Sequence, residues 1–295
     1  MKSEHQNSSK FRYSDKICMI TGTSDGIGKA TAFELAKLGF TIVMVCRNRE
    51  KSLIVLNEIK KISNNSSHEL LLADLSSQDD IRRVVKEFKD KHDKLHLLIN
   101  NAAIAPQKHR NLTKSGLELN FAVNYLGHFL LTLLLLDIIK KSSPARIINV
   151  VSSAEKYAPF DINDLQLMHK YSAFRAYAQS KRECILFTYE LARHVDNTGV
   201  KSICLNLGGV KTKVSSGMPG FYGIMAKLYQ PFALTPLKAS ESIIYLATEQ
   251  AIDNGQYFEK KKPDKSSKES YDAVIAKKLW DLSLNLTGIT QLEVN

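Results

Sequence analysis

The stretch that decides the fold is residues 21–28, which read Thr21-Gly22-Thr23-Ser24-Asp25-Gly26-Ile27-Gly28. A short apolar run, residues 17–21, leads into it, and an amphipathic helical pattern, residues 27–38, follows it at once. Glycines at this spacing let a strand-to-helix turn tighten and let the backbone approach a pyrophosphate, which sits on the positive N-terminus of the helix. We predict a nucleotide site here, the alternative being a tight turn without a ligand. The predicted contacts are Gly22, Ser24, Asp25, Gly26, Ile27 and Gly28.

Outward from this turn, strand and helix patterns alternate along the chain. The predicted strands are 17–21, 41–45, 69–72, 95–99, 146–151 and 200–205. The predicted helices between them are 27–38, 49–61, 78–89, 117–140 and 173–194. Strands that are apolar without alternation are buried on both faces, as parallel strands are. The sequence therefore predicts an α/β fold, a single Rossmann-like doubly wound parallel sheet flanked by helices on both faces. After Leu207 the pattern loosens.

Composition narrows the functional classes. The 295 residues are 44% apolar and 24% charged, close to globular averages, which excludes a disordered, collagen-like or coiled-coil chain. Lys and Arg number 41 against 30 Asp and Glu, a net charge of +11 that would suit nucleic acid, anionic lipid or a phosphorylated ligand. The basic residues are scattered, with one modest concentration at 260–268, so we expect a solvated surface and no nucleic-acid partner.

Cysteine usage and the N-terminus indicate an intracellular protein. The four cysteines show neither pairing nor metal-ligand spacing, so no metal site is predicted. Residues 1–16 are polar and lack the apolar stretch of a signal peptide. The most hydrophobic segment, residues 129–139, is too short to cross a bilayer and is expected to be a core helix. We expect a cytoplasmic protein, or one attached peripherally to an intracellular membrane, that is not secreted.

The end of the second predicted strand indicates which dinucleotide is bound. An NAD site places Asp or Glu there, to bond the ribose hydroxyl. This chain instead has Cys46 and then Arg47, with no carboxylate until Glu50. Arg47 can receive the extra phosphate of NADP, so NADP(H) is favoured over NAD(H); the alternative is an arginine that only lies on the surface. Asp74 is placed either to meet the adenine or to cap the next turn.

A second motif carries the chemistry. Tyr177 and Lys181 are four residues apart on the predicted helix 173–194, so their side chains lie on one face. A nearby ammonium favours the phenolate form of a tyrosine. Such a tyrosine can give or take a proton while hydride moves between a nicotinamide and a carbonyl carbon. The spacing is common by chance, and it gains weight from the motifs that accompany it.

The accompanying motifs are Thr21 to Gly28, Asn100-Asn101-Ala102-Ala103, Asn124 and Ser152-Ser153. In this order and at these intervals the chain resembles the classical short-chain dehydrogenases/reductases over roughly residues 14–286. It looks most similar to the branch of retinol dehydrogenases and the WW-domain oxidoreductase, on the segments Cys46 to Asn48, Asn124 to Phe129 and Leu279 to Asp281. It is more similar still to the X-chromosome-linked member, which acts on polyprenoid alcohols and aldehydes, at residues 23–28, 177–181 and 186–189.

The resemblance implies roles for individual residues. Tyr177 would be the acid/base, and Lys181 would favour its phenolate and bond the nicotinamide ribose. Ser153 would hydrogen-bond the substrate oxygen, and Asn124 would hold a water linking Lys181 to solvent. Two further residues would serve the cofactor: Asn100, which supports the sheet beside it, and Thr212, which touches its carboxamide. Each of these polar residues has an ordinary structural alternative, a cap or a bond to backbone.

The resemblance also implies the organisation of the chain. We expect one NADP-binding domain, residues 14–286, between a polar tail, 1–13, and a C-terminal tail, 287–295. Residues 217–237 are rich in apolar and aromatic side chains and would cover the substrate. That favours an apolar retinoid, polyprenoid or steroid alcohol, aldehyde or ketone; alternatively, the segment packs on the core or docks on a membrane. A homodimer through residues 133–139 and the catalytic helix is expected by resemblance only.

Two positions depart from the family pattern. Ala103 stands where Gly is usual, and its methyl group would strain the backbone if its φ were positive. Leu207 replaces the usual Pro before Gly208, which leaves the turn less rigid. Neither touches the acid/base group.

The alternative to an active oxidoreductase is a cofactor-binding scaffold or sensor of the same fold with little or no catalysis. A serine hydrolase is not supported, because the chain has no G-x-S-x-G elbow.

Overall fold

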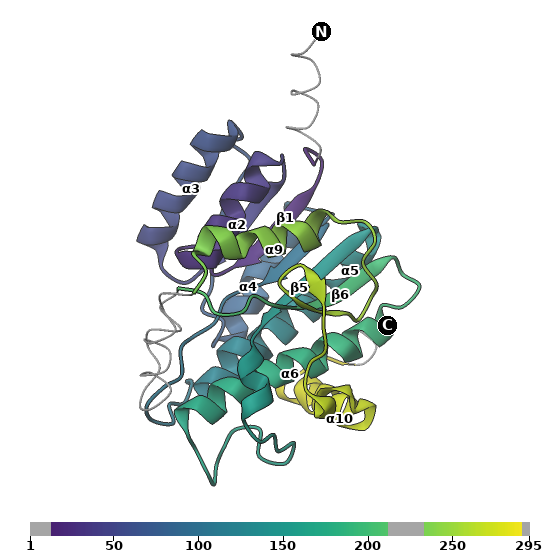
Figure 1. Cartoon of the computed structure of the whole chain (residues 1–295). Helices are drawn as coiled ribbons and strands as arrows, with labels where there is room; N and C mark the ends of the chain where they lie inside the picture. Colours follow the sequence, from purple (N-terminus) through teal and green to yellow (C-terminus); the bar gives the residue numbers. More distant parts are fainter. Residues whose placement is uncertain (1–12, 212–232, 291–295) are drawn as a thin grey trace.

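The computed structural model describes residues 13–211 and 233–290, and its centre is one eight-stranded sheet (Figure 1). The strand order is β3-β2-β1-β4-β5-β6-β7-β8, so the order reverses between β1 and β4. All neighbours pair in parallel except β7 and β8, which are antiparallel. The strands are β1 (Ile17–Thr21), β2 (Thr41–Cys46), β3 (Glu69–Leu72), β4 (Leu97–Asn100), β5 (Ala145–Val151), β6 (Val200–Asn206), β7 (Tyr257–Glu259) and β8 (Lys262–Pro263).

Helices cover both faces of this sheet. They are α2 (Gly26–Lys37), α3 (Arg49–Ser63), α4 (Gln78–Lys89), α5 (Gly127–Lys141), α6 (Ala173–His194), α9 (Pro236–Thr248) and α10 (Ala273–Thr287), with short turns η1 (Phe121–Leu126), η2 (Ser153–Tyr157) and η4 (Lys268–Tyr271). The core beneath α2, α3 and α9 takes Ile20 and Met44 from the sheet. The core beneath α4, α5, α6 and α10 takes Met19 and Val43. Successive strand residues thus enter opposite cores, and the predicted doubly wound sheet is confirmed.

Local chemistry explains where most helices begin. Side chains of Asn48, Ser77, Ser172 and Asp272 accept hydrogen bonds from the first-turn amides of α3, α4, α6 and α10. In α9, Thr235 does the same and Pro236 occupies the first helical position. Ser77 and Ser172 lie directly before helical patterns, and the predicted ranges of α4 and α6 match the structure residue for residue.

Three features lie outside the sequence prediction. The helix expected over 117–140 begins after Glu118, whose carboxylate accepts the Phe121 amide (2.7 Å) and caps it. Its segment η1, Phe121–Leu126, is wound as a π-helix. The elements α9, β7, β8 and α10 all follow Leu207, where the pattern loosens. Antiparallel β8 modifies the all-parallel sheet that was predicted. It has two residues, too few for any periodicity to show in the sequence.

The long apolar helix is a core helix, as its sequence predicts. In the described part of the chain the stretch Phe121–Lys141 is long and apolar enough to cross a membrane, but 89% of its most apolar window is buried in the fold. From residue 133 to 139 only Leu134 and Asp137 reach the surface. A partner docking on this helix would therefore meet those two side chains, not the apolar run. The homodimer stays a prediction.

The C-terminal helix α10 covers the outer side of α6 (Figure 1). Trp280 meets Phe129 edge-on at 5.3 Å between ring centroids and stacks on His194 at 4.3 Å. The Tyr125 hydroxyl lies 2.6 Å from that of Ser283. Ile289 is buried beyond the end of α10, so the packed part of the chain extends past residue 286, into the segment expected to be a tail.

Candidate functional site

The glycine loop joins β1 to α2 at the carboxyl edge of the sheet, where the strand order reverses. A side chain at Gly28 would place its Cβ 2.2 Å from the Gly22 carbonyl oxygen, so only glycine permits this approach. Gly22 and Gly26 have φ of +75° and +60°, the left-handed region. A Cβ added to Gly26 would meet nothing within 4 Å, which leaves open space at the N-terminus of α2. The loop therefore fits a dinucleotide pyrophosphate.

Not every predicted loop residue has the same local task. The Asp25 carboxylate accepts the Gly26 amide (2.8 Å) and caps α2. Ser24 and Ile27 are partly buried within the turn. The Lys29 ammonium is 2.6 Å from the Glu58 carboxylate, so α2 and α3 are paired there. The charge of Lys29 is thus already paired, and what the loop itself offers a phosphate is the positive end of α2 with its amides.

The Thr21 hydroxyl holds this loop against the loop that follows β4. It accepts the amides of Asn101 and Ala102, each at 2.9 Å, and lies 2.9 Å from His128 Nε2. His128 Nδ1 lies 3.0 Å from the Asn124 carbonyl, which can only accept, so the ring proton sits on Nδ1. Burial lowers the pKa of His128, and in the neutral ring Nε2 accepts the Thr21 proton. The Thr21 oxygen also lies 3.4 Å from the Ile99 carbonyl, a longer contact for the same proton, and both of its acceptor positions are used by the two amides. Sequence reasoning assigned no role to His128, although it lies one helical turn after Asn124.

The end of β2 brings Arg47 and Asp74 together. Arg47 Nη1 is 3.5 Å from an Asp74 oxygen, and the Arg47 side chain is 73% exposed. The other Asp74 oxygen accepts the Ser76 amide (2.9 Å) and hydroxyl (2.7 Å), so Asp74 caps this turn. Its contact with the adenine stays a prediction. Because the Arg47 side chain is exposed and its contact with Asp74 is long, its guanidinium can also bond an anion beside the loop.

The chemical residues lie on α6, β5 and η1. Tyr177 and Lys181 are both buried, with the Lys181 ammonium 5.8 Å from the centre of the Tyr177 ring. The same ammonium donates to the Val150 carbonyl of β5 (3.0 Å). Ser153 opens the short turn η2, and the next residue, Ala154, packs against Tyr177. The fold thus brings the serine turn, the tyrosine and the lysine to one place.

Asn124 is buried in η1 and bonds to several neighbours. Its side-chain oxygen accepts the Ile104 amide (2.8 Å), and its side-chain nitrogen donates to Ser180 (3.1 Å). Its carbonyl accepts from His128 and from the Cys184 thiol (3.1 Å). Asn124 therefore fixes the loop after β4 to the catalytic helix. The water relay through it stays a prediction.

Asn100 belongs to a row of polar side chains inside the sheet. Its nitrogen donates to Thr132 (3.0 Å) and to Asn149 (2.8 Å), and Asn149 donates to Thr188 (2.9 Å). The row crosses β4 and β5 beneath α5 and α6, which agrees with a supporting task. The Asn100 side-chain oxygen is buried, and no residue within 13–211 or 233–290 hydrogen-bonds to it.

With this geometry in place, comparison with known proteins assigns the family. The sequence profile of the short chain dehydrogenases matches residues 16–219. The chain belongs to the short-chain dehydrogenase family. It is 36% identical to mouse retinol dehydrogenase 13 over 289 residues, 95% of this chain and 86% of that protein. It is 37% identical to human polyprenol dehydrogenase over 284 residues, 93% of this chain and 86% of that protein. The expected resemblance to the retinol dehydrogenase branch is confirmed.

A solved structure supports the same fold. An uncharacterized protein from Mycobacterium paratuberculosis superimposes with a TM-score of 0.75 over 95% of this chain and 96% of its own, at 26% identity. As a short-chain dehydrogenase with named dehydrogenases among its relatives, the protein is an oxidoreductase that acts on CH–OH groups with a nicotinamide cofactor.

The two departures from the family pattern are accommodated by this short-chain dehydrogenase. Ala103 is not among the residues with positive φ, so its methyl group causes no left-handed strain. Leu207 is buried, and Gly208 takes the turn with φ of +72° while its amide donates to the Asn206 side chain (3.1 Å). Thr212 and most of the predicted substrate-covering segment lie outside the described residues.

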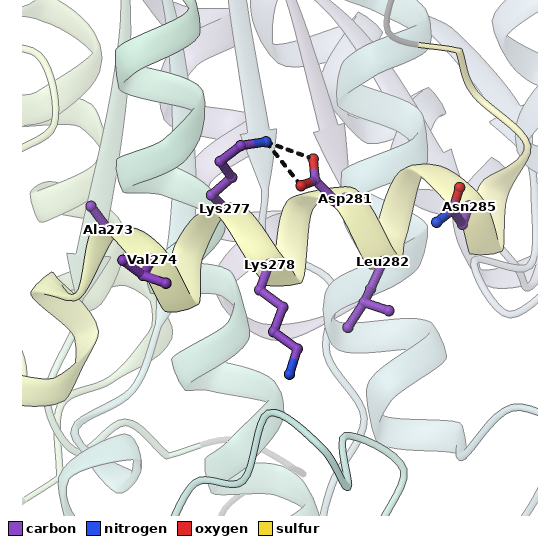
Figure 2. Close-up of a pocket in the computed structure, with 7 residues that line it drawn as sticks. All are labelled: Ala273, Val274, Lys277, Lys278, Asp281, Leu282 and Asn285. Atoms are coloured by element: carbon purple, nitrogen blue, oxygen red, sulfur yellow. Dashed lines mark hydrogen bonds and ion pairs between the residues drawn. The ribbon is translucent and has the colours of Figure 1, made fainter.

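A hollow of about 480 Å³ lies along the exposed face of α10 and is unrelated to this site (Figure 2). Val274 and Leu282 are among its lining residues, and Figure 2 shows the Lys277–Asp281 ion pair (2.9 Å) on the side of the helix opposite Leu282. None of the predicted cofactor or catalytic residues lines it. The candidate site is therefore at the carboxyl edge of the sheet and not in this hollow.

The Thr21–His128 contact predicts a pH dependence of stability. Burial lowers the pKa of His128 to about 4 from the model-peptide value of 6.5. Below pH 6.5 the unfolded chain binds a proton that the folded protein does not bind until pH about 4. The free energy of unfolding therefore falls with falling pH across this interval, by roughly 3 kcal/mol from this group. In His128→Gln, which keeps a donor and an acceptor, that part of the slope disappears.

Urea denaturation of both proteins from pH 7 to pH 4 measures this slope. His68 is the matched control, since burial also lowers its pKa to about 4 and it lies far from the site, between β2 and α3. His68→Gln should remove a similar part of the slope without weakening NADPH binding at pH 7. Equal slopes in wild type and His128→Gln would contradict the assignment of a neutral His128.

Proposed function

We propose that this protein transfers hydride reversibly between NADP(H) and the hydroxyl or carbonyl group of an apolar substrate of the retinoid, polyprenoid or steroid type. The observation that carries the proposal is the placement of buried Tyr177 and Lys181 beside the Ser153 turn, with the glycine loop at the same edge of the sheet. The relatives named for retinol and polyprenol support the substrate class. In the cell the direction would follow the cofactor ratio.

Residues of this chain would move the proton of the substrate hydroxyl. In alcohol oxidation the Tyr177 phenolate would take the hydroxyl proton as a carbonyl forms, and in reduction the phenol would return it. Lys181, held by the Val150 carbonyl, would stabilise the phenolate with its charge and bond the nicotinamide ribose. Ser153 would orient the substrate oxygen. The nicotinamide of the bound cofactor would supply or accept the hydride. The pyrophosphate of the same cofactor would lie against Gly22, Gly26 and Gly28 at the N-terminus of α2.

The first prediction from the proposed function concerns turnover. Nicotinamide absorbance is followed with NADPH and NADH against a panel of retinoid, polyprenoid, steroid and short aldehydes. Tyr177→Phe should lower kcat by at least about a hundredfold, because it removes the proton donor, and should leave NADPH binding unchanged. Tyr245→Phe on α9, in the opposite helix layer, is the control and should keep wild-type kcat.

The competing reading is a cofactor-binding scaffold with little or no catalysis. It would be supported if no member of the panel were turned over despite tight NADPH binding, and if Tyr177→Phe changed nothing. Ala103→Gly would then be the first reversion to make. The buried, paired state of Lys181 next to Tyr177 favours the enzyme, since a scaffold has no need of a desolvated ammonium beside a phenol.

The second prediction concerns the cofactor. Exposed Arg47 follows β2 and would bond the 2′-phosphate, a charge-assisted contact of about 1.5–3 kcal/mol. Arg47→Gln should therefore raise KM for NADPH by roughly tenfold to a hundredfold and leave KM for NADH nearly unchanged. Arg49→Gln, an exposed arginine two residues along, is the control and should change neither. Equal increases for both cofactors would contradict a 2′-phosphate contact.

The third prediction concerns peripheral membrane contact. Two hydrogen bonds hold the loops 107–116 and 161–172 together. The Tyr171 hydroxyl donates to the Gln107 carbonyl (2.7 Å), and Arg110 Nε donates to the Gln166 carbonyl (2.9 Å). They expose Leu112 (51%) and Met168 (66%). Exposed cations flank these two tips: Lys108, Lys114 and Lys170. Exposed apolar side chains next to lysines can bind an anionic lipid surface, into which an apolar substrate would partition.

Co-sedimentation with phosphatidylserine and with phosphatidylcholine vesicles tests this contact. Leu112→Ser/Met168→Ser should reduce the fraction bound to phosphatidylserine vesicles several-fold. Ile54→Ser on α3, where the side chain is 60% exposed, is the control and should bind like wild type. Equal binding of wild type and the double variant would remove these loops as the contact.

A further inference from the structure

Glu155 is a fully buried carboxylate two residues beyond Ser153, and the mechanism above does not use it. One of its oxygens accepts the Ser267 amide (2.9 Å). The other accepts the Ser267 hydroxyl (2.5 Å) and Arg182 Nε (3.3 Å). Arg182 also donates from Nη2 to the Glu155 backbone carbonyl. The charge is therefore neutralised and both oxygens are bonded, as a buried carboxylate requires.

The three partners come from separate parts of the chain. Glu155 lies in the serine turn η2, and Arg182 follows Lys181 directly on α6. Ser267 lies between β8 and α10, in residues 264–272, which we call the C-terminal segment, and is 112 residues from Glu155. Arg182 is itself buried and lies over the Phe160 ring, 5.9 Å from its centre. The Glu155–Arg182 ion pair thus joins the serine turn to the catalytic helix, and the Ser267 hydrogen bonds join the C-terminal segment to both.

The C-terminal segment has its own attachment to α6. The Ser266 hydroxyl lies 2.7 Å from that of Tyr189 on α6 and 2.6 Å from that of Ser270. The Tyr271 hydroxyl accepts the Ser266 amide (3.2 Å), and its ring stacks on Tyr189 at 5.1 Å. These contacts fix the C-terminal segment on α6, and so they position Ser267 next to Glu155.

The serine turn needs such a support. It has five residues and 3-10 geometry, too short to be stable alone. On one side Ala154 contacts Tyr177, and the Ser152 side chain caps the turn at the Ala154 amide (3.2 Å). On the other side Glu155 is the charged attachment. The position of the Ser153 hydroxyl relative to Tyr177 therefore depends on both contacts.

We propose that Glu155 is a positioning residue for the reaction. Through Arg182 and Ser267 it holds the serine turn in register with Tyr177, and the C-terminal segment is in this way part of the catalytic support. This rests on the proposed function of Ser153 and Tyr177. The competing reading is an ion pair that contributes to stability alone.

The experiment separates these readings by removing both charges at once. Replacing one partner of a buried ion pair leaves the other unpaired and is strongly destabilising, whereas replacing both with apolar residues is often neutral or stabilising. Glu155→Gln should therefore have the lowest Tm, and Glu155→Leu/Arg182→Leu should recover most of the loss. NADPH fluorescence gives the fraction of competent sites, and kcat is expressed per NADPH-binding site.

In the double variant we expect an NADPH Kd within about twofold of wild type and a kcat at least tenfold lower. Glu190→Gln is the control and should leave kcat unchanged, because Glu190 pairs with Arg193 near the far end of α6. Recovery of kcat to within twofold of wild type together with Tm would overturn the proposal, because the pair would then serve stability only.

Amide hydrogen exchange gives a readout that does not require turnover. In the NADPH complex of the double variant, residues 152–157 should exchange at least tenfold faster than in wild type, while 177–190 should exchange at the wild-type rate. Unchanged exchange at 152–157 would overturn the proposal even if no substrate were found. Absence of turnover in wild type itself would instead refute the proposed function.

Discussion

The hydroxyl of Thr21 is the contact on which the rest of the site depends. It sits at the end of β1, accepts two amides from the loop after β4 and donates to a histidine on α5. These are the two strands between which the sheet reverses its order, so one oxygen fixes both loops that would face the cofactor. Because the hydroxyl has no remaining donor or acceptor, neither loop can shift without leaving a buried polar group unpaired.

The neutral state of His128 is a condition of that arrangement. A protonated ring would direct a second N–H at an oxygen whose lone pairs are already occupied. The buried Lys181 ammonium adds a second reason, since its charge also disfavours a cation nearby. His128 therefore stays neutral and accepts a hydrogen bond from Thr21. The Lys181 ammonium is then the charged group next to Tyr177.

Polar side chains continue this organisation through the interior beneath α5 and α6. The Asn100–Asn149 pair is buried in the sheet with threonines at either end, and Asn124 connects η1 to α6 and to the loop after β4. A core built for stability alone would place apolar residues at these positions, because each buried amide must find partners to offset its desolvation. Their retention along the carboxyl edge agrees with a site that needs accurately placed groups.

The sequence by itself determined the alternation of strands and helices up to β6, the glycine turn and the pairing of Tyr177 with Lys181 on one helical face. Those features depend on neighbours within one or two turns, where periodicity, caps and glycine conformation act. It did not reveal α9, β7, β8 or α10, which are short or weakly patterned and gain their stability from packing on earlier elements.

Only the tertiary structure decided which buried groups meet. Thr21 and His128 are 107 residues apart and Glu155 and Ser267 are 112 apart, so no local pattern encodes either contact. The fold likewise brings Asp74 to Arg47 at the end of β2, a contact that no local pattern encodes. For the two buried contacts the physical reason is the same. A buried polar atom without a partner costs free energy, and the fold, not the neighbouring sequence, supplies the partner.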